Sequence, residues 1–210
     1  MRIPIASEGW PFIAGALVLT LLAWLVGTWL FVSSLVLTVF VVSFFRDPER
    51  VIPADDAAIV SPADGRVIIV EKVFDDRILN DEAMKISIFM TVFNVHVNRV
   101  PASGRVVEIR YNPGKFLSAN LDKASTENEQ NAVVLETPSG KRLVFTQIAG
   151  LVARRIVCYA AEGGELVRGD RFGLIRFGSR LDVYLPIDCT VTVKVGDRVS
   201  AGSSTLALWT

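Results

Sequence analysis

The sequence predicts a mainly β protein of the α+β type: a β-sandwich-like domain with few helices, preceded by a helical hairpin embedded in a membrane. Three observations support this prediction. An uncharged run of 37 residues extends from Gly9 to Phe45. The 165 residues after it have the charge content of an ordinary globular domain, and their apolar residues occur in short runs separated by turn residues. We therefore divide the chain into a membrane anchor, residues 1–45, and a β-rich domain, residues 46–210.

The uncharged run is too long for a signal peptide, whose apolar core spans roughly 7–15 residues. As one straight helix it would reach about 55 Å, against a hydrocarbon core of about 30 Å. A break near Val26-Gly27-Thr28 gives two helices, Pro11–Val26 and Trp29–Phe45, each about 25 Å long. The alternative is a single tilted span. Positive residues flank both ends of the run, which favours both termini, and the β-rich domain, on the cytoplasmic side of the inner membrane.

Beyond a charged, proline-containing linker, turn residues separate short apolar runs that predict strands. The expected strands are Ala57–Val60, Arg66–Val73, Lys85–Met90, Val92–Arg99, Arg105–Tyr111, Ala132–Glu136, Leu143–Ile148, Arg171–Phe177, Arg180–Tyr184 and Thr190–Val195. Pro138-Ser139-Gly140 is expected to form a hairpin turn. One helix is expected at Leu151–Ala161, ended by Gly163-Gly164. The segment Asn112–Asn131 has no sustained period and is expected to be a functional loop.

Composition excludes one class of partner. Lys and Arg total 22, and Asp and Glu total 22, so the formal net charge is zero. Nucleic-acid binders depend on an excess of positive charge, and no local cluster of Lys and Arg supplies one. DNA and RNA are therefore not expected as partners.

The two cysteines, Cys158 and Cys189, have neither the spacing nor the neighbouring histidines of a metal site. We expect reduced core thiols, the alternative being a nucleophilic cysteine, and we expect no metal.

Proton-transfer chemistry centres on His96, the only histidine. Strand alternation places His96 on a polar face with Asn94 and Asn98, opposite Phe93 and Val95. This pattern favours a proton-transfer group, with a surface histidine or a hydrogen-bonded structural histidine as the alternative. Two other short motifs, Asp64 before Gly65 and the pair Gly178-Ser179, are ordinary turn sequences when taken alone.

Four segments, taken together and in order, resemble the short form of phosphatidylserine decarboxylase. They are Pro62-Ala-Asp-Gly65; Phe93-Asn-Val-His-Val-Asn-Arg-Val-Pro101; Asn112-Pro-Gly-Lys-Phe116 with Asp122-Lys-Ala-Ser125 and Glu127-Asn-Glu-Gln-Asn131; and Phe172-Gly-Leu-Ile-Arg-Phe-Gly-Ser-Arg180. The resemblance covers about Arg46–Thr210, and an apolar N-terminal anchor agrees with it.

The resemblance implies a proenzyme that processes itself. Ser179 would attack the carbonyl of Gly178 to form an ester, and β-elimination would then leave a pyruvoyl group derived from Ser179. The products would be a large chain, 1–178, and a small chain, 179–210, which remain together as a heterodimer. The pyruvoyl group would form a Schiff base with the serine amine of phosphatidylserine and act as an electron sink as carbon dioxide departs, giving phosphatidylethanolamine without a metal.

Residue roles follow from the matched motifs. His96 and Asp64 stand at the positions of the acid–base pair that assists serine attack. The longer bacterial form has two histidines three residues apart, whereas this chain has His96 and then Arg99. If the two histidines divide self-processing and decarboxylation between them, then here His96 does both or Arg99 takes a part.

The loop 112–131 could close over the lipid headgroup. Lys115 and Lys123 are then candidates for its phosphate, and Arg176 or Arg180 for its carboxylate, the alternative for each being solvated surface charge.

Two other functions stay open. One is decarboxylation of another serine-headed lipid of the archaetidylserine type. The other is a non-enzymatic, membrane-anchored β-domain that binds a partner, in which Gly178-Ser179 is only a turn.

Overall fold

The computed structural model describes residues 3–116, 127–150, 155–176 and 179–210 of the 210-residue chain. By their internal contacts the residues divide into two units, Met1–Glu49 and Arg50–Thr210. The first unit is helical and the second is β-rich.

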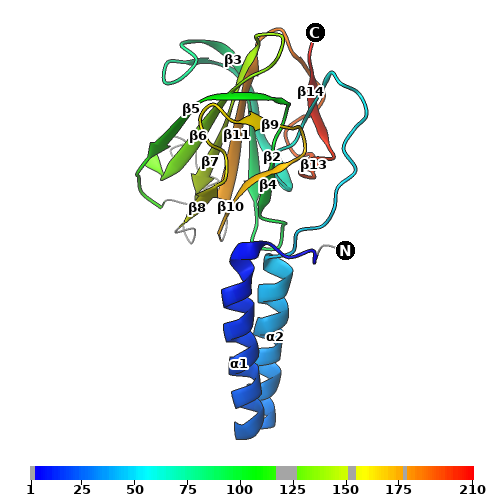
Figure 1. Cartoon of the computed structure of the whole chain (residues 1–210), viewed down its shortest axis with the longest axis vertical. Helices are drawn as coiled ribbons and strands as arrows, with labels where there is room; N and C mark the ends of the chain where they lie inside the picture. Colours follow the sequence, from blue (N-terminus) through cyan, green and yellow to red (C-terminus); the bar gives the residue numbers. More distant parts are fainter. Residues whose placement is uncertain (1–2, 117–126, 151–154, 177–178) are drawn as a thin grey trace. The chain divides into compact units, whose positions relative to one another are not determined.

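The N-terminal unit is a pair of apolar helices, α1 (Trp10–Val26) and α2 (Thr28–Phe44), preceded by a 3₁₀ turn, η1 (Ser7–Gly9). Figure 1 shows the two helices side by side. The predicted break at Gly27 and the predicted helix limits are confirmed to within one residue. The segment Ser7–Val26 has the length and composition needed to cross a membrane, whereas α2 has 17 residues.

Polar contacts link the two helices at the level of Thr20 and Thr38. The Oγ1 atoms of Thr20 and Thr38 lie 2.8 Å apart, in one hydrogen bond between the helices. Beyond the helix ends, Ile5 and Arg46 form an antiparallel bridge. The chain therefore enters and leaves the hairpin at the same end.

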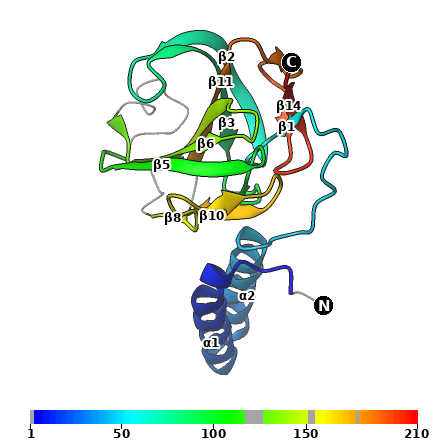
Figure 2. The ribbon, with the colours of Figure 1, turned by 45° about the horizontal axis from the view of Figure 1, so that its top comes forward.

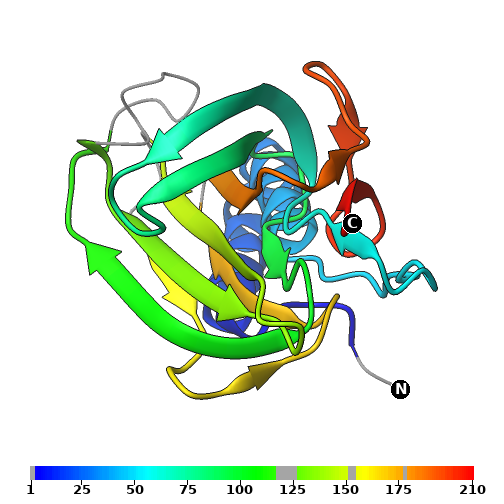
Figure 3. The ribbon, with the colours of Figure 1, turned by 90° about the horizontal axis from the view of Figure 1, so that it is seen from above.

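The second unit is built on an eight-stranded antiparallel sheet with the order β13-β2-β3-β11-β7-β6-β5-β9. Its strands are β2 (Gly65–Asp75), β3 (Asp81–Met90), β5 (Gly104–Asn112), β6 (Gln130–Glu136), β7 (Arg142–Ala149), β9 (Glu165–Leu166), β11 (Ser179–Pro186) and β13 (Arg198–Val199). Figure 3 shows how strongly this sheet curls. The curl encloses an inner face, which is the core side of the domain.

Two three-stranded sheets complete the domain. One has the order β1-β14-β12 and the other β4-β10-β8. Their strands are β1 (Ala58–Val60), β14 (Thr205–Leu208), β12 (Thr190–Val191), β4 (Val97–Arg99), β10 (Arg171–Ile175) and β8 (Ile156–Cys158). β8 and β10 run side by side in Figure 2. The predicted mainly β domain is thus confirmed.

Alternation along β11 shows how the sequence creates the two faces of the large sheet. Leu181, Val183 and Leu185 are fully buried in the main core. Arg180 and Asp182, at the alternate positions, point to the other face, because successive strand residues alternate. The strand therefore carries an apolar inner face and a polar outer face, both covered.

Three predicted elements are wrong in the described residues. The helix expected at Leu151–Ala161 is replaced by β8, where the β-branched Ile156 and Val157 pair with β10; residues 151–154 lie outside the described residues. The strand expected at Val92–Arg99 begins only at Val97, after a turn. The strand expected at Thr190–Val195 ends at Val191.

Candidate functional site

Ser179 is the first residue of β11, a central strand of the large sheet, and lies at one end of that strand. It pairs with Met90 of β3 on one side and with Ala149 of β7 on the other. The residue is completely buried. Its Oγ donates a hydrogen bond to the sulfur of Met90 at 3.4 Å. A thioether is a weak acceptor, so this hydrogen bond holds the hydroxyl proton only weakly.

Three buried amide side chains connect β4 to the inner face of β6 and β7. Asn98 and Gln147 have no exposed surface, and Asn131 is 5% exposed. Gln147 Nε2 donates to Asn98 Oδ1 at 2.9 Å, and Asn131 Nδ2 donates to Gln147 Oε1 at 3.5 Å. Asn98 Nδ2 faces the sulfur of Met90 at 3.9 Å. The amides thus form a chain that ends at the methionine that contacts Ser179.

His96 lies between the turn at residues 91–94 and the start of β4, and not in a strand. The prediction that it occupies a polar strand face is therefore wrong: His96 is 1% exposed, whereas Phe93 is 74% exposed. The turn is closed by Asn94, whose Oδ1 accepts hydrogen bonds from the backbone and hydroxyl of Thr91. A turn closed in this way breaks the strand alternation on which the prediction depended.

The turn also determines the tautomer of His96. Its Nδ1 lies 2.9 Å from the carbonyl oxygen of Asn94. A carbonyl only accepts, so Nδ1 carries the hydrogen and Nε2 carries the lone pair of the neutral ring. Nε2 is then the ring atom able to accept a proton.

Asp64 lies immediately before β2 and is paired with Arg50. Arg50 contacts both carboxylate oxygens, at 2.9 and 2.8 Å, and the backbone N–H of Ala201 donates to Oδ1 at 2.8 Å. Among the described residues these are the hydrogen bonds of the carboxylate, so the structure does not join Asp64 to His96 directly. The next residue must be glycine, because a Cβ at position 65 would lie 2.3 Å from the carbonyl oxygen of Phe89.

Arg99 points away from the amide chain. Its guanidinium donates to the carbonyl oxygen of Gly169 at 2.8 Å, and its backbone N–H donates to that of Pro62 at 2.9 Å. Asn98, the preceding strand residue, faces the opposite side. The described contacts of Arg99 therefore connect β4 to the segment that carries Asp64.

The four candidate headgroup residues lie in different environments. Lys115 is exposed and pairs with Glu127 at 3.0 Å. Arg180 is completely buried and pairs with Asp182, so its guanidinium has no access to a headgroup in this structure. Arg176 is partly buried at the end of β10. Lys123, like Gly178, lies outside the described residues.

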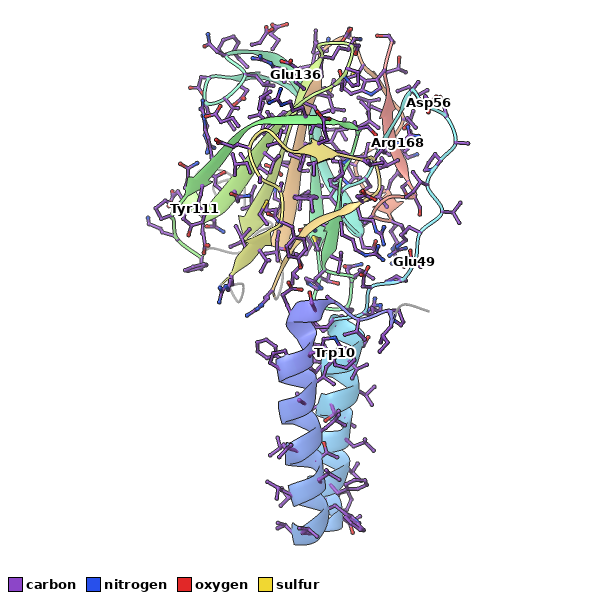
Figure 4. All side chains as sticks on the ribbon, viewed as in Figure 1. Trp10, Glu49, Asp56, Tyr111, Glu136 and Arg168 are labelled. Atoms are coloured by element: carbon purple, nitrogen blue, oxygen red, sulfur yellow. The ribbon has the colours of Figure 1, made fainter. Side chains whose placement is uncertain are left out.

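A cavity of about 330 Å³ lies elsewhere in the domain, lined in part by Asp56, Arg168 and Trp209. Figure 4 labels Asp56 and Arg168, on the side of the domain that carries β14. The Arg168 guanidinium donates to backbone carbonyl oxygens, including those of Asp55 and Ala58 at 2.6 and 2.8 Å. The Arg168 guanidinium thus holds the backbone of residues 55–58 in place. Ser179 does not line this cavity.

The sequence did not identify Met90, Asn98, Gln147 or Asn131 as site residues. Two signals were available: Asn98 and Asn131 lie within the matched segments, and Gln147 is a polar residue inside an apolar run, Val144-Phe-Thr-Gln-Ile148. In the described part of the chain, no three His, Cys, Asp or Glu side chains are grouped as a metal site would require.

Comparison with known proteins connects this geometry to a family. The model of the phosphatidylserine decarboxylase family matches residues 37–207. A relative from Cupriavidus taiwanensis is 55% identical over 205 residues, covering 97% of this chain and 94% of that protein. One from Geotalea uraniireducens is 56% identical over 209 residues, covering 98% and 96%. One from Neisseria meningitidis serogroup B is 52% identical over 203 residues, covering 97% and 76%.

All three are named phosphatidylserine decarboxylase proenzyme. The chain belongs to the phosphatidylserine decarboxylase family, whose members are carboxy-lyases.

Proposed function

We propose that this chain is a proenzyme that cleaves itself between Gly178 and Ser179, and that the two-chain product decarboxylates phosphatidylserine to phosphatidylethanolamine and carbon dioxide. The observation that carries the proposal is Ser179 itself. It is a buried hydroxyl, at the start of a central strand, with a thioether as its acceptor. Membership of the family and the proenzyme names of the relatives support the same reaction.

The cleavage uses atoms of the chain alone until its last step. Ser179 Oγ loses its proton to a base and bonds to the carbonyl carbon of Gly178, and the resulting oxyanion collapses with loss of the Ser179 nitrogen, which takes up a proton. The peptide bond has then become an ester. A base next removes the α-hydrogen of residue 179, and Gly178 leaves as a carboxylate. Water replaces the nitrogen of the remaining dehydroalanine, and ammonia is released.

His96 is the proposed base, because the hydrogen bond from Nδ1 to Asn94 leaves Nε2 as the proton-accepting atom. The chain places His96 two residues before Asn98, which contacts Met90, the partner of Ser179. Asp64 is proposed to support His96, although the structure joins it to Arg50. That support requires the carboxylate to exchange its Arg50 contact during the reaction.

The surroundings of Ser179 fit a pyruvoyl group. The pyruvoyl group has no hydroxyl and no ammonium group, so it needs no strong hydrogen-bond acceptor. In the described part of the chain, the cross-strand partners of residue 179 are Met90, through its thioether, and Ala149. When present, this group supplies the electron sink for decarboxylation. The chain contributes a dry site and a proton donor, proposed to be His96, for the carbon that loses carbon dioxide.

The hairpin explains why a lipid substrate and this domain belong together. Its apolar helices are proposed to sit in the inner membrane, with both ends on the cytoplasmic side. A membrane-bound substrate is then available without leaving the bilayer.

The test measures carbon dioxide release from phosphatidylserine labelled in the serine carboxyl group, using purified full-length protein in detergent micelles. We expect release by the parent protein and loss of release, of cleavage, or of both in His96→Ala. Thr137→Val, in the distant β6–β7 turn, serves as a control with parent activity. A parent protein that is cleaved but releases no carbon dioxide contradicts the proposed substrate, and a normal His96→Ala removes His96 from the mechanism.

A further inference from the structure

The chain of buried amides has an orientation that a single backbone atom determines. Gln147 Nε2 lies 3.2 Å from the carbonyl oxygen of Val157, which can only accept a hydrogen bond. The NH2 group of Gln147 must therefore point there, and it also donates to Asn98. Asn98 must in turn present its oxygen to Gln147. The NH2 group of Asn98 is thereby directed toward Met90.

Gly173 provides independent support for this arrangement. A Cβ at that position would lie 2.1 Å from the carbonyl oxygen of Val157 and 3.0 Å from Gln147 Nε2. A side chain on β10 would therefore displace the carbonyl that determines the orientation of Gln147. The close approach of β10 to this hydrogen bond requires glycine.

The NH2 group of Asn98 and the hydroxyl of Ser179 meet on one sulfur atom. Asn98 Nδ2 is 3.9 Å and Ser179 Oγ is 3.4 Å from Met90 Sδ. A thioether forms only a weak hydrogen bond with either donor. A buried N–H that lacks a good acceptor costs folding free energy. The hydrogen bond of such a donor therefore strengthens most when a stronger acceptor forms beside it.

We propose that the side-chain amide of Asn98 donates a hydrogen bond to the oxyanion that forms on Gly178 when Ser179 attacks, and that Gln147 is the residue that positions this amide. The inference deepens the proposed self-cleavage and rests on it. The attacked carbon is bonded to the nitrogen of Ser179, so negative charge develops next to Ser179 Oγ. A donor already oriented in a dry site stabilises that charge without reorganisation.

The interaction is useful because it exists mainly in the transition state. Before the attack, the acceptor that the described residues offer to the Asn98 NH2 group is a weak one, the sulfur of Met90 at 3.9 Å. In the tetrahedral intermediate it has an anionic oxygen. A contact that is much stronger in the transition state than in the ground state speeds the reaction.

The experiment follows self-cleavage of the full chain during cell-free synthesis with detergent, by measuring the ratio of intact to cleaved protein over time. Asn98→Leu keeps approximately the side-chain volume and leaves Gln147 bonded to Val157. We expect it to slow cleavage by about 10²–10³-fold, the usual effect of removing one oxyanion donor. The matched control is Thr146→Val, the buried neighbour of Gln147 on the opposite face of β7, which we expect to cleave at the parent rate.

A second readout separates the step that is affected. Hydroxylamine cuts an ester but not a peptide bond. If Asn98 acts in ester formation, intact Asn98→Leu protein stays uncut by hydroxylamine. Cutting after Gly178 would show that the ester forms normally, and would overturn the proposal.

The role of Gln147 is tested by combining variants. Gln147→Met removes both of its donated hydrogen bonds, and we expect a smaller loss of cleavage rate than in Asn98→Leu. The double variant should be no slower than Asn98→Leu alone, because the two residues act as one unit. Independent, multiplying losses would indicate a purely structural effect and overturn the positioning role.

The outcomes also distinguish this inference from the function on which it rests. A parent chain that does not cleave overturns both. A parent chain that cleaves, together with Asn98→Leu and Asn98→Ala chains that cleave equally fast, overturns the Asn98 role alone. If Asn98→Leu does not fold, as judged by its thermal unfolding beside Ser179→Ala, the smaller Asn98→Ala supplies the same comparison.

Discussion

Arg180 and Asp182 form an ion pair directly beside the proposed nucleophile, on the covered outer face of β11. Both are completely buried. Arg180 Nε donates to Asp182 Oδ1 at 2.5 Å, and its Nη2 donates to Ser87 Oγ at 2.8 Å. Removing water from two charges is costly, and only close pairing with further hydrogen bonds offsets that cost. The pair makes the strand after Ser179 dependent on its partner β3.

Breaking this pair should destabilise the domain strongly. Asp182→Asn leaves a guanidinium that is buried without its counter-charge, and we expect the free energy of unfolding to fall by about 3–5 kcal/mol. The measurement is urea unfolding in detergent, in a Ser179→Ala background so that every protein is one chain. The double variant Arg180→Met with Asp182→Leu should recover much of the loss. A loss within about 0.5 kcal/mol, as at an ordinary surface site, would contradict the account.

The two cysteines should be unreactive near neutral pH. Burial raises the pKa of the Cys189 thiol to about 11, with the Asp188 carboxylate adding to the shift. Burial also raises the pKa of Cys158, although hydrogen bonds from the Ala160 backbone and the Asn131 side chain oppose it. A raised pKa keeps a thiol protonated to higher pH, and the thiolate is the reactive form.

We therefore expect iodoacetamide at pH 8 to modify both cysteines far more slowly in the folded protein than in urea. For Cys189 the folded thiolate fraction is about 10⁻³, and labelling should increase as the pH rises toward 11. Peptide mass spectrometry after timed labelling measures the rates. Modification of Cys189 at the rate of the unfolded chain would contradict the buried environment.

At the residue scale, the sequence leads to Ser179 as the proposed nucleophile, a role that stays a prediction, but it does not lead to the buried residues around Ser179. A motif match needs only residue order, whereas Asn98, Gln147 and Met90 come together only through the pairing of β3, β7 and β11. His96 was identified as the proton-transfer candidate, but its burial was predicted wrongly. The turn closed by Asn94 depends on a side-chain hydrogen bond that strand periodicity does not reveal.

At the scale of elements, the sequence predicted strands well where a clear turn separates two apolar runs. The β6–β7 hairpin, with its turn at 138–140, is an example: Gly140 has a φ of +79°, which glycine adopts without strain. The error at Leu151–Ala161 arose because three apolar residues fit a helical face as well as a strand, and pairing with β10 decides between them.

The helical hairpin leads to a prediction about sidedness. The bridge between Ile5 and Arg46 places the start of α1 and the end of α2 together. Single cysteines introduced as Ser7→Cys or Pro48→Cys, in a chain lacking both native cysteines, should therefore react with an impermeant maleimide from the same side of sealed vesicles. Gly27→Cys should not react from that side. Labelling of positions 7 and 48 from opposite sides would indicate a single span.

At the scale of the whole molecule, the strands of the proposed small chain pair with strands of the large one. Its first strand, β11, pairs with β3 and β7, its strand β13 pairs with β2, and β14 pairs with β1. Leu181, Val183, Leu185 and Leu206 also belong to the common core. Cleavage before residue 179 therefore removes one covalent bond and leaves this pairing in place.

We expect the two chains to stay together through gel filtration in mild detergent and to separate only in denaturant. Comparing denaturing and native size measurements on the same sample tests this. Release of the small chain without denaturant would contradict the strand pairing. The pairing of distant strands, such as β1 with β14, was not predictable from the sequence, because local patterns specify strands but not their partners.

The most direct test of the central claim is the mass of the purified full-length protein, with Ser179→Ala prepared in parallel. The account predicts two chains from the parent, 1–178 and 179–210, the smaller one lighter by one ammonia than a chain beginning with serine. It predicts a single intact chain from Ser179→Ala. A folded parent protein that remains one uncut chain would contradict the account and would favour a membrane-anchored binding domain.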